Sequence, residues 1–70
     1  MQTPRGTVTP ADVGKRASFQ YELPNGYASE VVGRIEAFDE QANTFMVRNR
    51  EGAVVRVPAH GVRFSKVIPG

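Results

Sequence analysis

The chain has 70 residues, a formal net charge of +2 and no cysteine. A chain of this length forms one small domain, which buries only about 60% of the surface that its unfolded chain exposes. The lack of cysteine excludes disulfides and thiolate metal sites. No stretch reaches the roughly 20 apolar residues of a membrane span, and residues 1–5 open no apolar run of a signal peptide. We therefore expect a cytoplasmic domain that does not enter a membrane.

Charge is distributed unevenly along the chain. Residues 1–43 carry four basic and six acidic side chains, a balance of −2, whereas residues 44–70 carry five basic and one acidic side chain, a balance of +4. Charged side chains on exposed strand faces usually serve solubility. The positive second part also suits an anionic partner, so both interpretations stay open.

The first structural signal is a single helical turn that follows a polar start. We expect residues 1–8 to form a disordered N-terminal arm and residues 9–69 to form the domain. Thr9 can cap the turn, Pro10 fits its first position and Gly14 can end it. This turn would cover one end of a barrel and lead into the first strand.

Residues 15–23 and 27–38 are predicted to form the two strands of a hairpin. Apolar and polar residues alternate along the first strand, which is the period of a half-buried strand. The Pro-Asn-Gly sequence between the strands suits a three-residue loop with Gly26 in the left-handed conformation. This loop length places Phe19 opposite Val31.

Two further loops continue the same pattern. A five-residue loop at residues 39–43 would pair Ala37 with Phe45, and a three-residue loop at residues 50–52 would place Gly52 in the left-handed conformation. Both lengths keep one strand face buried on either side of the loop. The remaining predicted elements are strands at residues 44–49, 53–58 and 62–68 and a short turn at residues 58–61.

Several short strands at regular spacing indicate a small β-domain. We predict an all-β fold: a small SH3-like five-stranded antiparallel barrel with a one-turn N-terminal helix and a short 3₁₀ turn before the last strand. An OB-type barrel fits less well, because no helix is available between the third and fourth strands. The side chains predicted to be most buried are Phe19, Ile35, Phe45, Val47, Val55, Val57 and Val62.

The six aromatic side chains divide into core and surface. Phe64 and Tyr21 are best interpreted as core residues, together with Phe19 and Phe45. Tyr27 and Phe38 are the aromatic residues that we expect to be exposed, because they stand near loops.

Nothing in the chain favours catalysis by this domain alone. His60 is the only histidine, and no cysteine or carboxylate stands at metal-ligand spacing from it. The serines have no nucleophile motif around them, and no glycine-rich phosphate loop is present. We therefore expect a non-enzymatic domain with no catalytic residue, no metal and no cofactor.

A mixed apolar and basic surface is the most promising binding feature. The pairing of the third and fourth strands would place Met46 and Arg48 on an outer face, opposite Arg56 and Val54. Methionine and arginine are enriched at protein interfaces, and arginine also suits phosphate contacts, although no aromatic side chain for base stacking accompanies it. We expect a protein partner or a catalytic domain, with nucleic acid as the alternative. The predicted binding residues are Met46, Arg48, Arg50, Val54, Arg56, Arg63 and Lys66.

Five segments carry a resemblance to a known family. They are residues 12–16 (DVGKR), 23–26 (LPNG), 31–33 (VVG), 51–58 (EGAVVRVP) and 66–69 (KVIP). Together they resemble the small SH3-like domain that precedes the catalytic domain in a family of bacterial GNAT-type acetyltransferases. In that family acetyl-coenzyme A binds the catalytic domain, so the resemblance implies a non-catalytic accessory module, monomeric or weakly dimeric. This is our leading interpretation.

A second resemblance is to the Sm-like RNA-binding fold. Residues 33–43 (GRIEAFDEQAN) have the spacing of the first Sm motif, in which the residues matching Asp39 and Asn43 hold a base. The resemblance implies an RNA-binding protein that forms a ring. The distance from Gly26 to Gly33 is longer than in that family, so we place this interpretation second. Ordinary turn chemistry is the simpler explanation of Asp39 and Asn43.

Overall fold

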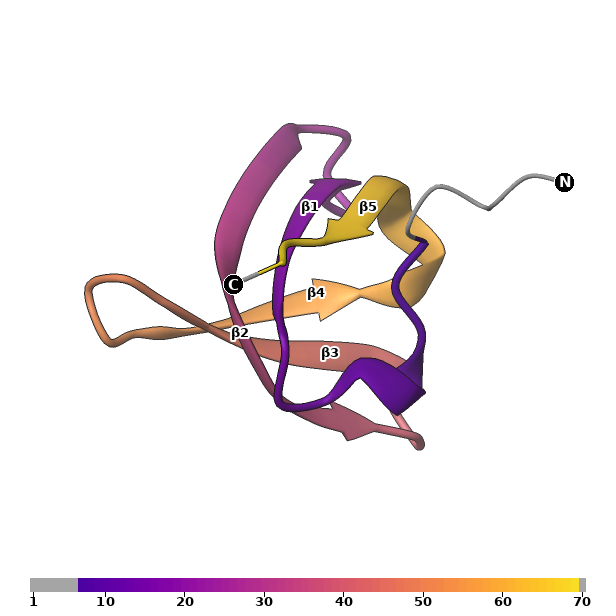
Figure 1. The fold of residues 1–70 in the computed structure, drawn as a ribbon. Coiled ribbons are helices and arrows are strands. Elements are labelled where there is room, and N and C mark those ends of the chain that lie inside the picture. The colour runs from indigo at the N-terminus through magenta and orange to yellow at the C-terminus, as the bar shows by residue number, and fades with distance from the viewer. Residues whose placement is uncertain (1–6, 70) are drawn as a thin grey trace, which may run out of the picture.

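The structure is a computed structural model that describes residues 7–69. It is an all-β domain whose strands are all paired antiparallel, in the order β4-β3-β2-β1-β5. In Figure 1 the long β2 curves from the layer of β1 and β5 to that of β3 and β4, so the sheet folds over on itself. The predicted fold class is confirmed. The elements are η1 (Pro10–Asp12), β1 (Arg16–Glu22), β2 (Ala28–Asp39), β3 (Thr44–Asn49), β4 (Val54–Pro58), η2 (Ala59–Gly61) and β5 (Val62–Val67).

Two of the predicted hairpin registers are confirmed. Phe19 pairs with Val31 between β1 and β2, and Val47 pairs with Val55 between β3 and β4. The glycines that end the two loops take positive φ angles, 92° at Gly26 and 87° at Gly52. Only glycine adopts such angles without strain, so these turn residues fix the length of each loop and thereby the register.

The predicted pairing of Ala37 with Phe45 is wrong. A bulge in β2 follows the pair of Ile35 with β3, and after it Ala37 pairs with Met46 and Phe38 pairs with Phe45. One extra residue reverses the faces of a strand, so Phe38 turns inward and Ala37 is exposed. The Phe38 and Phe45 rings then pack with their centroids 4.8 Å apart. The expectation that Phe38 is exposed is therefore wrong as well.

A second irregularity moves Phe64 to the surface. Between β1 and β5, Gln20 pairs with Phe64 while the next residue of β1, Tyr21, pairs with Val62. The shift puts the Phe64 side chain on the outer face beside Gln20, where it is 49% exposed. The prediction that Phe64 belongs to the core is wrong, whereas Tyr21 is buried and Tyr27 is exposed, as expected.

The buried face holds most of the predicted core. Val55 and Val62 are only partly buried and pack against this core. Val8 also belongs to it, and its N–H donates to the Ser65 hydroxyl at 3.1 Å. Residues 1–6 of the predicted arm lie outside the described residues. The predicted core residues that are buried are Phe19, Ile35, Phe45, Val47 and Val57.

The turn before β1 has the predicted cap. The Thr9 hydroxyl accepts from the Ala11 N–H at 3.2 Å, and the Asp12 carboxylate accepts from the Thr9 N–H at 2.9 Å. The hydrogen bond from the Thr9 N–H, ahead of the pairing with Lys15, lowers the pKa of Asp12. Over residues 7–69, the structure contains no helix with the length and apolar character to cross a membrane.

Candidate anion-binding groove

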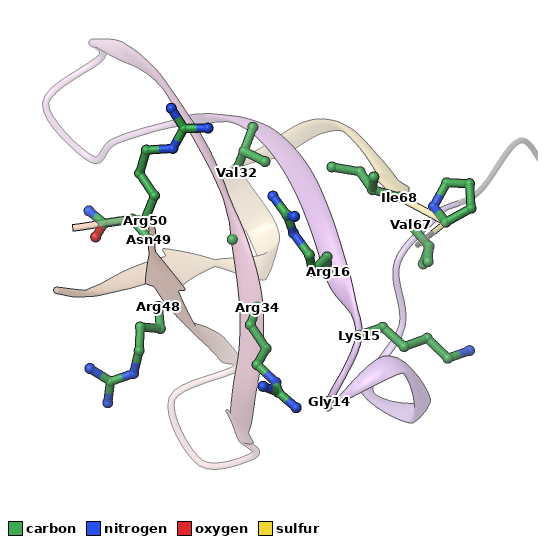
Figure 2. A pocket seen from close by; sticks show the side chains of 12 residues that line it. Gly14, Lys15, Arg16, Val32, Arg34, Arg48, Asn49, Arg50, Val67 and Ile68 are labelled. Atoms are coloured by element: carbon green, nitrogen blue, oxygen red, sulfur yellow. The ribbon is translucent and has the colours of Figure 1, made fainter. Parts of the chain in front are cut away.

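A groove of about 830 Å³ crosses the outside of the sheet. It runs over the start of β1 and the middle of β2, between the end of β3 on one side and the residues after β5 on the other (Figure 2). The described residues that line it include no carboxylate and no aromatic side chain. Its basic lining residues are Lys15, Arg16, Arg34, Arg48 and Arg50.

The close approach of β2 and β3 at Gly33 shapes the groove. A Cβ atom built on Gly33 would overlap the Arg48 carbonyl oxygen and lie 2.8 Å from the Arg48 carbonyl carbon and 3.1 Å from the Asn49 Cα. All of these are backbone atoms, so no rotation of a side chain could make room. Glycine is therefore required here for the two strands to approach this closely.

Three arginines stand side by side across three strands. Arg34 of β2 pairs with Arg16 of β1 on one side and with Arg48 of β3 on the other. Directly opposed Cβ atoms in antiparallel strands are about 4.5–5.5 Å apart, and like charges in such positions are destabilising. In Figure 2 the side chains of Arg16 and Arg34 point away from each other, as repulsion favours. The free domain thus holds a concentrated positive charge at this place.

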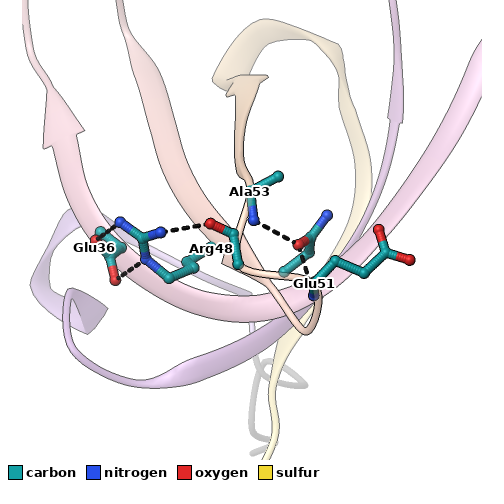
Figure 3. A network of polar contacts seen from close by, with 6 residues as sticks. Glu36, Arg48, Glu51 and Ala53 are labelled. Atoms are coloured by element: carbon teal, nitrogen blue, oxygen red, sulfur yellow. Dashed lines mark hydrogen bonds and ion pairs between the residues drawn. The ribbon is translucent and has the colours of Figure 1, made fainter.

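Arg48 is the one member of this row with a close carboxylate partner in the described structure. Its Nε donates to Glu36 at 2.9 Å, its Nη2 donates to the other carboxylate oxygen at 3.2 Å, and its Nη1 donates to the Gly52 carbonyl at 2.6 Å (Figure 3). The hydrogen bonds from Arg48, and then the charges of Arg48 and Arg34, lower the pKa of the Glu36 carboxyl. The contacts fix one wall of the groove while they compensate the Arg48 charge.

The turn between β3 and β4, at the end of the same wall, is held by the Asn49 side chain. The Asn49 amide oxygen accepts from the Glu51 N–H at 2.9 Å and from the Ala53 N–H at 3.0 Å (Figure 3). Arg50 is presented by this turn. A held turn places the Arg50 guanidinium over the groove without a large loss of chain entropy on binding.

The cations of the groove differ in how far they are compensated. Lys15 forms an ion pair with Asp12 at 3.2 Å. Among the ion pairs of residues 7–69, neither Arg16 nor Arg34 nor Arg50 takes part. Arg34 still lies near enough to Glu36 to influence it, so Arg16 and Arg50 carry the least compensated charges.

The sequence matches a model of a known protein family. The model described as the Rv0428c N-terminal Sm-like domain matches residues 11–66, which is most of the chain. The chain belongs to this family. Neither the curated proteins nor the solved structures gave a match. The match supports the Sm-like resemblance that we placed second and gives no support to the acetyltransferase-associated one.

The predicted binding residues do not all lie on one surface of this Sm-like domain. Met46 lies opposite Arg56 and Arg48 opposite Val54 on the outer face of β3 and β4, as predicted. Arg50 lines the groove. Two others, Arg63 and Lys66, lie on β5, which three strands separate from β4 in the sheet order, and Arg63 forms an ion pair with Glu22.

In this Sm-like domain Asp39 and Asn43 support the turn between β2 and β3. One Asp39 carboxylate oxygen accepts from the N–H groups of Gln41 and Ala42 at 3.1 and 3.2 Å. Asn43 takes a left-handed φ of 53°, and its carbonyl accepts from the Ala59 N–H at 2.9 Å. Neither residue lines the groove. These contacts are those of ordinary turn residues.

Sequence reasoning missed the centre of the groove. Arg16 and Arg34 were not among the predicted binding residues, although the predicted register of the first hairpin already sets them opposite each other. Two arginines at opposed positions, without a carboxylate between them, are the signal that could have found the site.

Proposed function

We propose that this Sm-like domain is a non-catalytic module that binds single-stranded RNA in the basic groove. The observation that carries the proposal is a groove lined by five cationic side chains and no described carboxylate. Proteins that bind single strands use positively charged grooves that follow the nucleic-acid backbone. RNA is the partner that the resemblance to the Sm-like fold implied.

The expected affinity depends on how many phosphates the groove neutralises. Each phosphate contact on a single strand contributes about 0.7 to the slope of log K against log salt. Arg16, Arg34 and Arg50 lack ion-pair partners among the described residues, so three contacts give a slope of roughly 2. Binding should therefore be weak at physiological salt and clear at low salt.

The proposal assigns no catalytic role to the titratable side chains of the described residues. His60 is exposed on η2 and has no side-chain hydrogen bond to a carboxylate in residues 7–69. In the same residues no three histidine, aspartate or glutamate side chains gather into a group that could hold a metal ion. The domain as proposed here binds its partner and leaves it chemically unchanged.

A second candidate function is that of an accessory module inside a longer protein. The matching family is named for an N-terminal domain of Rv0428c, and a domain at that position can dock on the next domain of the same chain. The outer face of β3 and β4, with Met46 and the 42% exposed Val54, would serve such a contact. An accessory module would be a monomer or weak dimer, so a solution mass measurement separates it from the ring that the resemblance to the Sm-like fold implied.

A titration of fluorescein-labelled oligouridine, followed by anisotropy at low salt, tests the leading proposal. We expect the wild-type domain to bind and the double variant Arg16→Gln/Arg50→Gln to lose most of this affinity. Arg63→Gln is the matched control, because it removes a positive charge that lies outside the groove. An absence of binding by the wild type at low salt, or unchanged binding by the double variant, would falsify the proposal.

A further inference from the structure

We infer that the groove recognises the phosphodiester backbone of its ligand and reads no bases. This inference rests on the proposed function and specifies which part of the nucleic acid the site contacts. It follows from the side chains that the groove presents, from the direction of its guanidinium groups, and from the hydrogen bonds that already occupy its one polar amide.

The described lining of the groove offers no aromatic surface on which a base could stack. Base recognition in single strands relies on aromatic side chains against which successive bases lie. The two most exposed aromatic residues stand elsewhere: Tyr27 is 71% exposed next to the turn after β1, and Phe64 lies on β5 opposite Gln20. Neither lines the groove, whose apolar members are aliphatic, as at Val32 and Ile68.

Apart from its arginines, the described lining of the groove has no free polar side chain that could read the edge of a base. Asn49 is the one amide side chain among the lining residues. Its oxygen already accepts two backbone N–H groups of its own turn, so it cannot offer the paired donor and acceptor that adenine recognition requires. The remaining groups are donors of the kind that phosphate oxygens accept.

Two of the arginines approach the middle of the groove from opposite sides. Figure 2 shows the guanidinium groups of Arg16, from β1, and Arg50, from the turn after β3, both directed toward Val32. A phosphodiester lying over Val32 would meet guanidinium groups on both sides, and arginine binds phosphate oxygens in a bidentate manner.

The repulsion within the groove supplies a second argument for an anionic ligand. Arg16 and Arg34 are opposed on neighbouring strands, an arrangement that weakens the free domain. A phosphate bound by Arg16 would compensate one of the two opposed charges and so relieve the repulsion, whereas an uncharged base would not. Arg16→Gln should therefore raise the melting temperature of the free domain at low salt while it weakens ligand binding.

Three ligands with equal numbers of phosphates test the inference: oligouridine, oligoadenosine and an abasic ribose-phosphate oligomer. We expect dissociation constants within about threefold of one another, because a base-reading contact would separate them by roughly 5- to 150-fold. Arg16→Gln should weaken all three by one common factor, and Arg63→Gln should weaken none. Circular dichroism verifies that each variant is folded.

The outcomes separate this inference from the proposed function. If the RNA oligomers bind but the abasic oligomer does not, or if one RNA oligomer is strongly preferred over the other, the domain reads bases and only the inference is overturned. If none of the three ligands binds at low salt, the proposed function itself fails. Common affinity with a common loss in Arg16→Gln supports both.

Discussion

Replacing Gly33 by alanine tests whether the groove depends on the close approach of β2 and β3. The added Cβ would overlap the Arg48 carbonyl oxygen and lie 2.8 Å from the carbonyl carbon. Since both atoms are backbone, β3 must move away from β2 by about an ångström to restore an ordinary contact. The displaced segment includes the pair formed by Gly33 and Asn49.

The cost of this displacement can be estimated from its parts. Overpacking of this kind costs about 1–3 kcal/mol, and a weakened ladder hydrogen bond costs about 0.5–1.5 kcal/mol. The lower entropy of an unfolded chain with alanine offsets about 0.4–1 kcal/mol. The net loss of roughly 0.5–4 kcal/mol, centred near 2 kcal/mol, is a large share of the total stability of a domain of this size, about 4–10 kcal/mol.

Urea unfolding followed by circular dichroism measures this loss. The matched control is Glu30→Ala, because Glu30 is exposed on the same strand and takes no part in the ion pairs of residues 7–69. We expect Gly33→Ala to lower the free energy of unfolding by about 2 kcal/mol and Glu30→Ala to change it by less than about 0.5 kcal/mol. A Gly33→Ala domain with the urea midpoint of the wild type would refute the reasoning.

Three further predictions concern charge. Glu36→Gln frees the Arg48 guanidinium, so RNA affinity at low salt should rise and the salt slope should steepen by up to about 0.7; anisotropy titrations that show weaker binding would contradict this. Arg16→Gln should stabilise the free domain at low salt by about 0.2–1 kcal/mol through the removal of like-charge repulsion, and thermal melts that show a loss would argue against it. The folded-state pKa values of Asp12 and Glu36 lie below their ordinary values of 3.8 and 4.5. Their contribution to stability is therefore present above pH 4.5 and lost as pH falls through the folded-state pKa values. Urea midpoints should decline below this pH, and less steeply in Glu36→Gln.

The turns could be predicted from the sequence because single residues determine them. Gly26 and Gly52 end loops in a conformation that other residues adopt only with strain, and the loop length then fixes which side chains face each other. The capped turn at Thr9 followed from the same kind of local signal. Local chemistry at these positions leaves few alternatives.

The two strand irregularities could not be predicted in this way. A bulge adds one residue without a distinctive composition, and in this domain such irregularities reverse the expected faces of Phe38 and Phe64. The energetic cause of the β2 bulge is tertiary, since it brings the Phe38 ring against Phe45 in the core. Phe38 did break the alternation of its strand, and this interruption was the available sign.

The candidate site was predictable only in part. The opposition of Arg16 and Arg34 follows from the register of one hairpin. The approach of Arg50 and of the residues after β5 depends on the curl of the whole sheet, which brings distant parts of the chain to one groove. Period and turn signals describe neighbouring strands, and they do not specify how far a sheet curls.

An NMR titration of the ¹⁵N-labelled domain with oligouridine at low salt is the most direct test of the claim that the groove is the binding site. We predict that the largest amide shifts occur at Arg16, Gly33 and Arg50, and that added salt reverses them. Shifts centred on Asp39 and Asn43 would show that the turn between β2 and β3 holds the RNA, and they would contradict the assignment of the groove.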